Sequence, residues 1–276
     1  MVIDKNKNFM VSIVLYNEDN KFKDKIDLLV KNNYSVYIYD NSPDSKYARE
    51  YLKDTDKIKY YTAGKNVGLG ISMSTLASQA YYYGYKYMFF LDQDTILSNE
   101  TLNFIDKLTA YNDIDKYTAL SISNDNCTDL KNINYNEEIN IKDVLLIRNS
   151  GSLFNLKNLK KIDWFDISFF VDGVDYEFSL RSSLNGYSVG LIKNVPGFDH
   201  VSGQGYSKYN FLGFNLINRK YSLNRMKDIF ISSSRLISRS FFTKKFNFFY
   251  IILRNTITFF LLQLLIRLSK KENNEK

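Results

Sequence analysis

Residues 87–94 read Tyr-Met-Phe-Phe-Leu-Asp-Gln-Asp, an apolar run that ends in two carboxylates. A short apolar run bounded by polar residues predicts a strand that is buried on both faces of a sheet. Helix-like stretches lie on each side of it, at 68–83 before the run and at 98–111 after it. Strands and helices in alternation are typical of βαβ units, in which helices cover both faces of a mainly parallel sheet.

The same alternation extends along most of the chain. We therefore predict an α/β body at 1–205, with halves at about 1–125 and 126–205, followed by a helical, basic and apolar extension at 206–276. The other strands are expected at 9–16, 36–40, 58–62, 119–123, 144–147 and 188–192, and the other helices at 21–32, 45–53, 155–162 and 172–184, with a small-residue turn at 149–152.

Polar residues follow four of the predicted strands at the point where each strand ends. In parallel α/β sheets, ligands bind outside the carboxyl ends of the strands, so these residues predict a ligand site at one edge of the sheet. The residues are Tyr16 and Asn17 after the first strand, Asp40 after the second, Lys65 and Asn66 after the third, and Asp92, Gln93 and Asp94 after the fourth.

Asp92 and Asp94 are candidate metal ligands. Carboxylate oxygens at a strand end suit Mg²⁺ or Mn²⁺ bridging a diphosphate, although two Asp residues at such a place also act simply as turn formers. Gly68 and Gly70 precede a helix and would allow a close backbone approach and offer N–H groups. The third glycine of a dinucleotide motif is missing, which argues against a nicotinamide cofactor.

Two further sites in the second half carry titratable groups. Asp175 and Glu177 begin a predicted helix, where they either stabilise the helix dipole, with Arg181 paired to Glu177, or supply a general base to the cleft. His200 is the only histidine and follows the last predicted strand, where a further parallel strand would bring it to the same edge.

The composition limits the other classes of function. The single Cys excludes a disulfide framework, and the single His excludes metal sites that need several imidazoles. The net charge of +7 is uneven, because residues 201–276 hold 14 Lys/Arg and 3 Asp/Glu whereas residues 1–200 hold 23 and 27. A basic apolar tail on an acidic body argues against nucleic-acid binding and for a membrane-facing tail. The first residues show no apolar segment typical of a signal peptide.

The extension contains an apolar stretch at 246–266 that is flanked by lysines. It is long enough to span a bilayer, which takes about 20 apolar residues, but Arg254, Asn255 and Gln263 disfavour a span. A segment on the membrane surface, packing against the body or a second subunit in a homodimer, and a true span are the alternatives.

Several of these stretches together resemble the family 2 glycosyltransferases of the GT-A fold, most closely their bacterial rhamnosyltransferase branch. The resemblance covers about residues 9–200 in the family's order. It is carried by the stretches 11–17, 39–42, 66–70, 91–94, 150–153, 164–166 and 172–181 and by His200, with Asp-Gln-Asp and Val-Asp-x-Glu as the rhamnosyltransferase-like features.

The resemblance implies a nucleotide-binding half at about 1–125 and an acceptor-side half at 126–205. Asp175 aligns with the catalytic base, although Val174 replaces the usual Glu of a Glu-Asp pair and leaves Asp172 open as an alternative base. Further implied roles are nucleotide-sugar binding for Tyr16, Asn17, Asp40, Lys65, Asn66, Gly68, Asp92 and Gln93, metal binding for Asp92, Asp94 and His200, and the acceptor or donor-sugar side for Ser150, Gly151, Trp164, Asp172 and Glu177.

The implied reaction is an inverting, Mg²⁺- or Mn²⁺-dependent transfer of L-rhamnose from dTDP-L-rhamnose to a lipid-linked or oligosaccharide acceptor. Such an enzyme would work in the cytoplasm, at the inner face of the cell membrane, in surface polysaccharide synthesis. The alternatives are transfer from a UDP-hexose or UDP-N-acetylhexosamine, a non-catalytic nucleotide-sugar or glycan-binding module, and a phosphatase of the haloacid dehalogenase type. The last lacks the expected residues after Asp94.

Overall fold

The chain contains two compact units, Met1–His200 and Val201–Lys276. The structure is a computed structural model that describes residues 8–17, 22–44, 50–52, 55–96, 98–110, 112–122, 139–193, 199–200, 206–211 and 214–271.

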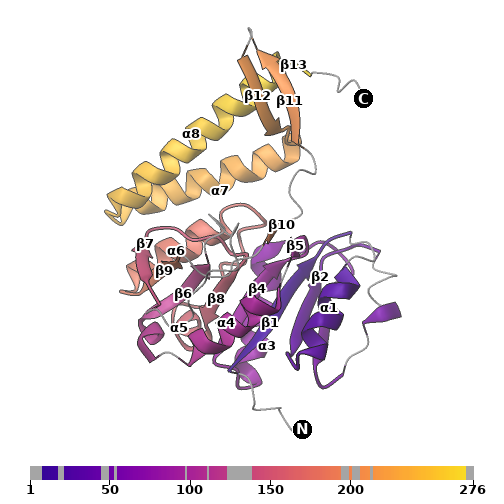
Figure 1. The fold of residues 1–276 in the computed structure, drawn as a ribbon. Helices are drawn as coiled ribbons and strands as arrows, with labels where there is room; N and C mark the ends of the chain where they lie inside the picture. The colour runs from indigo at the N-terminus through magenta and orange to yellow at the C-terminus, as the bar shows by residue number, and fades with distance from the viewer. Residues whose placement is uncertain are drawn as a thin grey trace. The chain divides into compact units, whose positions relative to one another are not determined.

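Eight strands of the first unit form one mixed sheet in the order β3-β2-β1-β4-β8-β6-β9-β7 (Figure 1). The strands β3, β2, β1 and β4 are parallel to one another, so their carboxyl ends share one edge. The strand β8 is antiparallel to both of its neighbours. The strands are β1 (Phe9–Leu15), β2 (Val36–Asp40), β3 (Ile58–Thr62), β4 (Tyr87–Asp92), β6 (Tyr117–Ile122), β7 (Ile141–Val144), β8 (Ser152–Asn155) and β9 (Ser188–Ile192).

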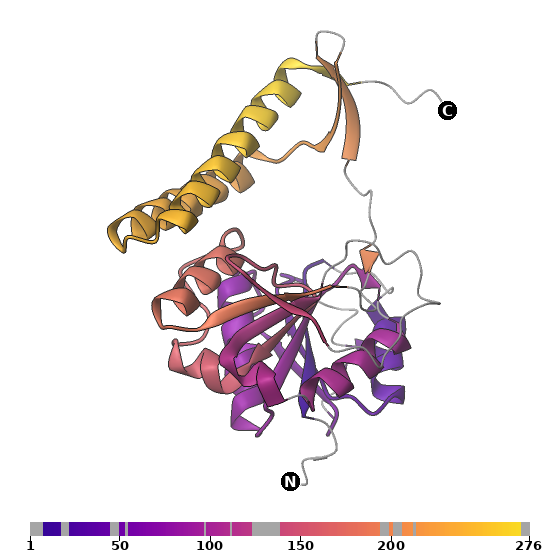
Figure 2. The ribbon, with the colours of Figure 1, turned by 60° about the vertical axis from the view of Figure 1, so that its left-hand side comes forward.

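Helices cover both faces of this sheet (Figure 2). On one face, α1 (Phe22–Lys31) and α4 (Asn99–Thr109) bury apolar side chains in a core with Val11 and Phe89. Because side chains alternate along a strand, Met10 and Met88 point to the other face. The helices of that face are α3 (Leu69–Tyr82), which contacts β1, β2, β4 and α5 (Leu156–Lys161), and α6 (Val174–Leu184). The structure confirms the predicted GT-A-like α/β fold.

The observed ends of the strands and helices can be compared with the ranges predicted from the sequence. The strands β2, β3, β4 and β9 coincide with the predicted ranges, and the helix expected at 45–53 lies mostly outside the described residues. The strand expected at 144–147 is wrong, because β7 ends at Val144 and pairs with β9 through residues 141–144. The buried Ile147 instead directs its backbone N–H toward the hydroxyl of Ser179 in α6. The strand β8 was missed, because its four residues follow a turn of small residues.

The second unit joins a β-hairpin to two long helices. The strands β11 (Tyr206–Phe211) and β12 (Phe214–Arg219) are antiparallel, and β13 (Lys270–Lys271) pairs with β11. The helices α7 (Leu223–Phe242) and α8 (Phe246–Leu268) pack side by side (Figure 1). The two helices confirm the helical extension, whereas the hairpin was not predicted. Among the described residues, α8 is the one helix long and apolar enough to cross a membrane.

Candidate active site

The loops that follow β1 and β4 hold each other at the carboxyl edge of the sheet. The side-chain oxygen of Gln93 accepts a hydrogen bond from the backbone N–H of Tyr16 at 2.7 Å, and its amide nitrogen donates to the Tyr16 carbonyl at 3.3 Å. Gln93 thus uses its amide to hold the loop after β1. The Tyr16 ring is 47% exposed and is available to a ligand, whereas the Gln93 amide is already bonded within the protein.

The polar residues after β2 are mostly bonded within the protein. Asp40 is 1% exposed, and its carboxylate accepts hydrogen bonds from the Ser42 N–H at 2.8 Å and from the Tyr60 hydroxyl at 2.7 Å. The Ser42 hydroxyl also accepts the N–H of Asn17 at 2.7 Å. Asp40 and Asn17 therefore brace the turns that follow β2 and β1.

The glycines at the start of α3 lie against the loop before α6. A Cβ atom on Gly68 would lie 2.4 Å from the Phe170 carbonyl oxygen, and one on Gly70 would lie 2.5 Å from the Phe169 carbonyl oxygen. The N–H of Leu69 donates to Phe170 at 2.5 Å. The glycines thus admit the backbone of the loop before α6.

The neighbouring polar residues complete this junction. The Asn66 side chain accepts the N–H of Gly68 at 2.9 Å, and Asn41 accepts the N–H of Val67 at 3.2 Å. Asn41 also donates to the Ser72 hydroxyl at 2.9 Å. Asn66 therefore shapes the turn before α3, while Lys65 is exposed beside it.

The Asp92–Asp94 turn is fixed from two sides. The Lys25 ammonium donates to the carbonyl oxygens of Asp92 at 3.1 Å and of Gln93 at 2.6 Å. From the other side, the Ser150 hydroxyl accepts the N–H of Asp92 at 3.0 Å. These contacts fix the backbone of the turn. The side chain of Asp92 is partly exposed and that of Asp94 is exposed.

Ser150 and Gly151 position the turn and the sheet. The Ser150 hydroxyl lies 3.1 Å from that of Thr95, and Ser150 itself is 8% exposed. Gly151 has a φ of 73°, donates its N–H to the Phe90 carbonyl at 2.8 Å and accepts the N–H of Ile122 at 3.1 Å. The hydroxyl of Ser150 and the backbone groups of Gly151 are thus bonded within the protein, and the expected role of these two residues on the sugar side stays a prediction.

His200 is brought to the same turn by a short, separate strand pair. The strand β10 (Asp199–His200) is antiparallel to β5 (Thr95–Ile96), with His200 opposite Thr95, the residue after Asp94. The expected parallel strand is wrong, but the expected proximity to the turn holds for the backbone. Among the residues whose side chains are described, no group of three His, Cys, Asp or Glu residues could hold a metal ion.

Asp175 lies in the first turn of α6, which begins after Gly173 with a φ of 82°. Its carboxylate accepts the N–H of Tyr176 at 2.9 Å. Burial raises the pKa of Asp175 to about 6 and the negative charge of Asp92 adds to this, while backbone N–H groups and the charge of Arg148 oppose it. The carboxylates of β4 and α6 are therefore near enough to repel each other, and Asp175 has a pKa suited to accepting a proton near neutral pH.

Arg148 was not predicted as a site residue. It is exposed in the segment between β7 and β8, and its carbonyl accepts the Ser152 hydroxyl at 2.5 Å. The next residue toward the N-terminus, Ile147, is linked to Ser179 of α6, so this segment is held beside the helix that carries Asp175. Only this tertiary contact reveals Arg148, since nothing in the sequence around it marks a cleft.

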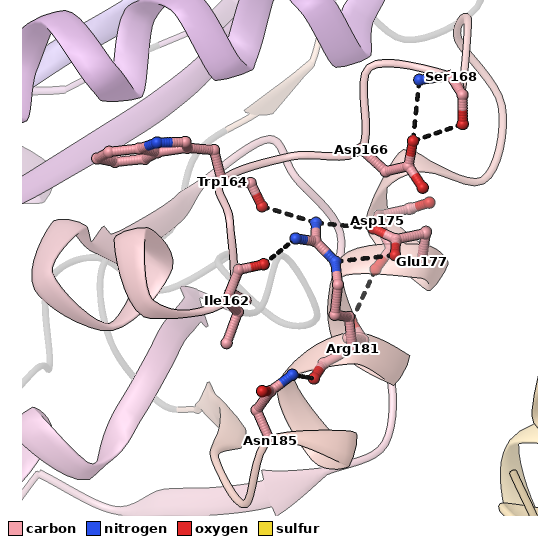
Figure 3. A network of polar contacts seen from close by, with 9 residues as sticks. Ile162, Trp164, Asp166, Ser168, Asp175, Glu177, Arg181 and Asn185 are labelled. Carbon is pink, nitrogen blue, oxygen red and sulfur yellow. Dashed lines mark hydrogen bonds and ion pairs between the residues drawn. The ribbon is translucent and has the colours of Figure 1, made fainter.

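Glu177, two positions further along α6, is held by Arg181 in a network of polar contacts (Figure 3). It is 1% exposed, and its two oxygens accept hydrogen bonds from the Nε and Nη2 atoms of Arg181, each at 2.9 Å. The Arg181 guanidinium also donates to the carbonyls of Trp164, at 2.6 Å, and Ile162. The i+4 pairing considered from the sequence is the one found.

The Trp164 side chain packs within the protein. Its ring packs edge-on against Tyr81 at 5.7 Å, near the C-terminal end of α3. Eleven residues of helix separate Tyr81 from Gly70, or about 16 Å at 1.5 Å per residue. Trp164 thus anchors the loop far from the strand ends. Asp172 precedes α6, where it is partly buried.

The sheet order, with its parallel strands and a carboxylate turn at their carboxyl edge, defines a GT-A-type α/β protein. The sequence matches the model of glycosyl transferase family 2 over residues 10–163, more than half of the chain, so the chain belongs to this family. Asp175 and His200 lie beyond the matched range. No curated protein sequence matches the chain.

Two solved structures share the fold at low sequence identity. S. aureus TarS is 16% identical, with a TM-score of 0.52 over 83% of this chain and 39% of its own. GalNAc-T7, solved with UDP, GalNAc and Mn²⁺, is 12% identical, with a TM-score of 0.55 over 79% of this chain and 46% of its own. The chain thus spans less than half the length of either protein.

Proposed function

We propose that this glycosyltransferase is an inverting, metal-dependent enzyme in which Asp175 is the general base. The observation that carries the proposal is the raised pKa of Asp175 in the first turn of α6. Burial and the Asp92 charge raise the pKa of Asp175 at the edge where ligands of parallel α/β sheets bind. Carboxylates with perturbed pKa values in such places are the usual candidates for acid–base chemistry.

The proposed step is a single displacement. The Asp175 carboxylate accepts the proton of an acceptor hydroxyl, whose oxygen forms a bond to the anomeric carbon of the donor sugar. The bond from that carbon to the diphosphate breaks on the opposite side, and the nucleoside diphosphate leaves with the electron pair. Attack from the face opposite the leaving group inverts the anomeric centre. General-base assistance of this kind is typically worth about 10²–10⁴-fold in rate.

The turn carries the type of side chain that a hard divalent cation prefers. Asp92 and Asp94 supply carboxylate oxygens, and the backbone of His200 lies beside the same turn. Bound Mg²⁺ or Mn²⁺ would neutralise charge on the departing diphosphate. The contacts of Lys25 and Ser150 to the backbone of the turn would support the two carboxylates in this role.

For the donor we propose dTDP-L-rhamnose, which is supported by the Asp-Gln-Asp and Val-Asp-x-Glu features of the sequence. A UDP-N-acetylhexosamine is the second candidate, which the UDP and GalNAc in the GalNAc-T7 structure favour. The exposed Tyr16 ring is the proposed stacking surface for either base. A lipid-linked or oligosaccharide acceptor at the cytoplasmic face of the membrane fits the basic, apolar second unit.

The test is a donor panel scored for release of the nucleoside diphosphate, with and without Mn²⁺. We expect metal-dependent release that is fastest with dTDP-L-rhamnose among dTDP- and UDP-sugars. Asp94→Ala should abolish the Mn²⁺ dependence of dTDP binding. The matched control is Asp56→Ala, which removes an exposed carboxylate just before β3, at the opposite edge of the sheet. Release from no donor would contradict the enzymatic proposal, and wild-type dTDP and Mn²⁺ titration by Asp94→Ala would contradict the metal assignment.

A further inference from the structure

One side of α8 carries a stripe of exposed apolar side chains that the sequence pattern did not reveal. At about 100° per residue, these side chains fall within an arc of about 60°. The buried residues Phe248, Ile252 and Ile266 lie on the opposite side, against α7. The six members of this apolar stripe, each 49–68% exposed, are Phe246, Tyr250, Ile257, Leu261, Leu264 and Leu268.

Aromatic contacts extend the exposed apolar surface from the stripe onto α7. Phe230 is 59% exposed, and its ring lies 6.0 Å from that of Phe260 in α8. Phe241 is 51% exposed, and its ring lies 6.2 Å from that of Phe246. Exposed apolar side chains gathered on neighbouring helices often mark a binding surface.

Charge favours an anionic lipid surface over a second copy of the chain. Residues 201–276 hold 14 Lys/Arg and 3 Asp/Glu, so two copies of this unit would repel each other. The helix α8 itself contains no acidic residue. Lys244 and Lys245 stand exposed or partly exposed between the helices, and Arg254 lies at the edge of the stripe with an exposed side chain. Basic residues beside an apolar helix face are the pattern of helices that lie on anionic membranes.

The polar residues of α8 limit how deeply this helix can enter a bilayer. Gln263 is fully buried, donates to the Arg219 carbonyl at 2.9 Å and accepts the Tyr221 N–H at 3.0 Å. Arg267 donates to the Tyr221 carbonyl at 2.7 Å. These bonds tie α8 to the end of β12 and the start of α7. A spanning α8 would break them or draw the polar hairpin into hydrocarbon, where unsatisfied groups cost several kcal/mol each. An orientation in the plane of the surface keeps them.

We propose that the apolar stripe docks α8 in the plane of an anionic phospholipid bilayer, with Arg254 and the lysines of the interhelical turn at the headgroups. Only the biological role of this docking rests on the proposed function, because docking would hold the transferase beside a lipid-borne acceptor. The binding itself needs no donor, acceptor or metal.

The experiment compares two neighbouring glutamates in the full-length protein. Ile257→Glu places a charge within the stripe, and Thr258→Glu places the same charge on an exposed position about 100° around the helix. Co-sedimentation is measured with phosphatidylcholine vesicles with and without phosphatidylglycerol. We expect binding only with phosphatidylglycerol, weakened by salt, and at least about tenfold weaker for Ile257→Glu than for Thr258→Glu.

The controls separate this idea from the proposed function. Metal-dependent dTDP binding should be equal in both variants, because neither position belongs to the active site. Equal vesicle binding by the two variants would overturn the stripe as the docking face. Absence of vesicle binding by the wild type would overturn the proposal while leaving the transferase assignment intact. Self-association that Ile257→Glu alone abolishes, without lipid binding, would identify a second copy as the occupant.

Discussion

The two sides of α6 hold carboxylates in opposite environments. On one side, Asp175 lies near Asp92, and burial raises its pKa to about 6. On the other, Glu177 is buried against Arg181, which satisfies both of its oxygens. Two residues of helix thus separate a carboxylate kept ready to accept a proton from one fixed in an ion pair. The difference shows that acid residues at a helix start acquire their roles from the groups packed against them.

The largest expected effect comes from Asp175→Asn. If this side chain removes the acceptor proton, turnover should fall by about 10²–10⁴-fold while donor binding stays near the wild-type value. The folded protein should be at least as stable, because a buried carboxylate is replaced by a neutral group. Rates of nucleotide release at saturating donor, with dTDP affinity measured in parallel, test this. Near-wild-type turnover would move the base to another residue, with Asp172→Asn as the next variant.

Glu177→Gln should lower the stability of the protein and leave its turnover unchanged, the opposite of Asp175→Asn. It leaves the Arg181 charge buried without its partner, and breaking a buried ion pair typically costs about 3–5 kcal/mol. We expect urea unfolding to show a loss of this order, while the folded fraction keeps its turnover. The double variant Glu177→Met/Arg181→Met removes both charges and should recover much of the stability. A large loss of turnover with unchanged stability would place Glu177 in the reaction.

The contrast also explains what the sequence could predict. Strands such as β2 and β4 were predictable because apolar runs with polar ends encode them locally, and the residues at their ends lie at one edge because the strands are parallel. The packing of Trp164 could not be predicted, because it depends on contact with Tyr81, far along α3.

Other residues depend on tertiary contacts that no local pattern encodes. Lys25 reaches the carboxylate turn from α1, across 67 residues of sequence. Gly68 and Gly70 fit a ligand-binding turn and a tight backbone junction equally well by sequence, and only the structure reveals the Phe169 and Phe170 carbonyls packed against them. The apolar stripe of α8 was hidden because this helix is apolar on its buried side as well.

The pH dependence should follow the raised pKa of Asp175. Protonation inactivates a base, so kcat/KM should fall below about pH 6, tenfold per pH unit at the limit. Stability should change in the opposite direction. The folded-state pKa exceeds the ordinary value of 3.8, so the native state binds this proton more tightly than the unfolded state does. The free energy of unfolding should therefore decline as the pH rises from about 4 to about 6. Asp175→Asn should lack this part of the decline in urea titrations at several pH values.

The smallest effect is expected from Arg148→Gln. The charge of Arg148 favours the ionised form of Asp175, so its removal should raise the pKa of Asp175 and move the acidic limb of the rate profile to higher pH. Because Arg148 is exposed, salt screens its charge, and the difference between variant and wild type should shrink at high ionic strength. Arg148→Lys keeps the charge and should restore the profile. An unchanged limb in Arg148→Gln, or a loss that Arg148→Lys fails to rescue, would mean that Arg148 does not act on Asp175 through its charge.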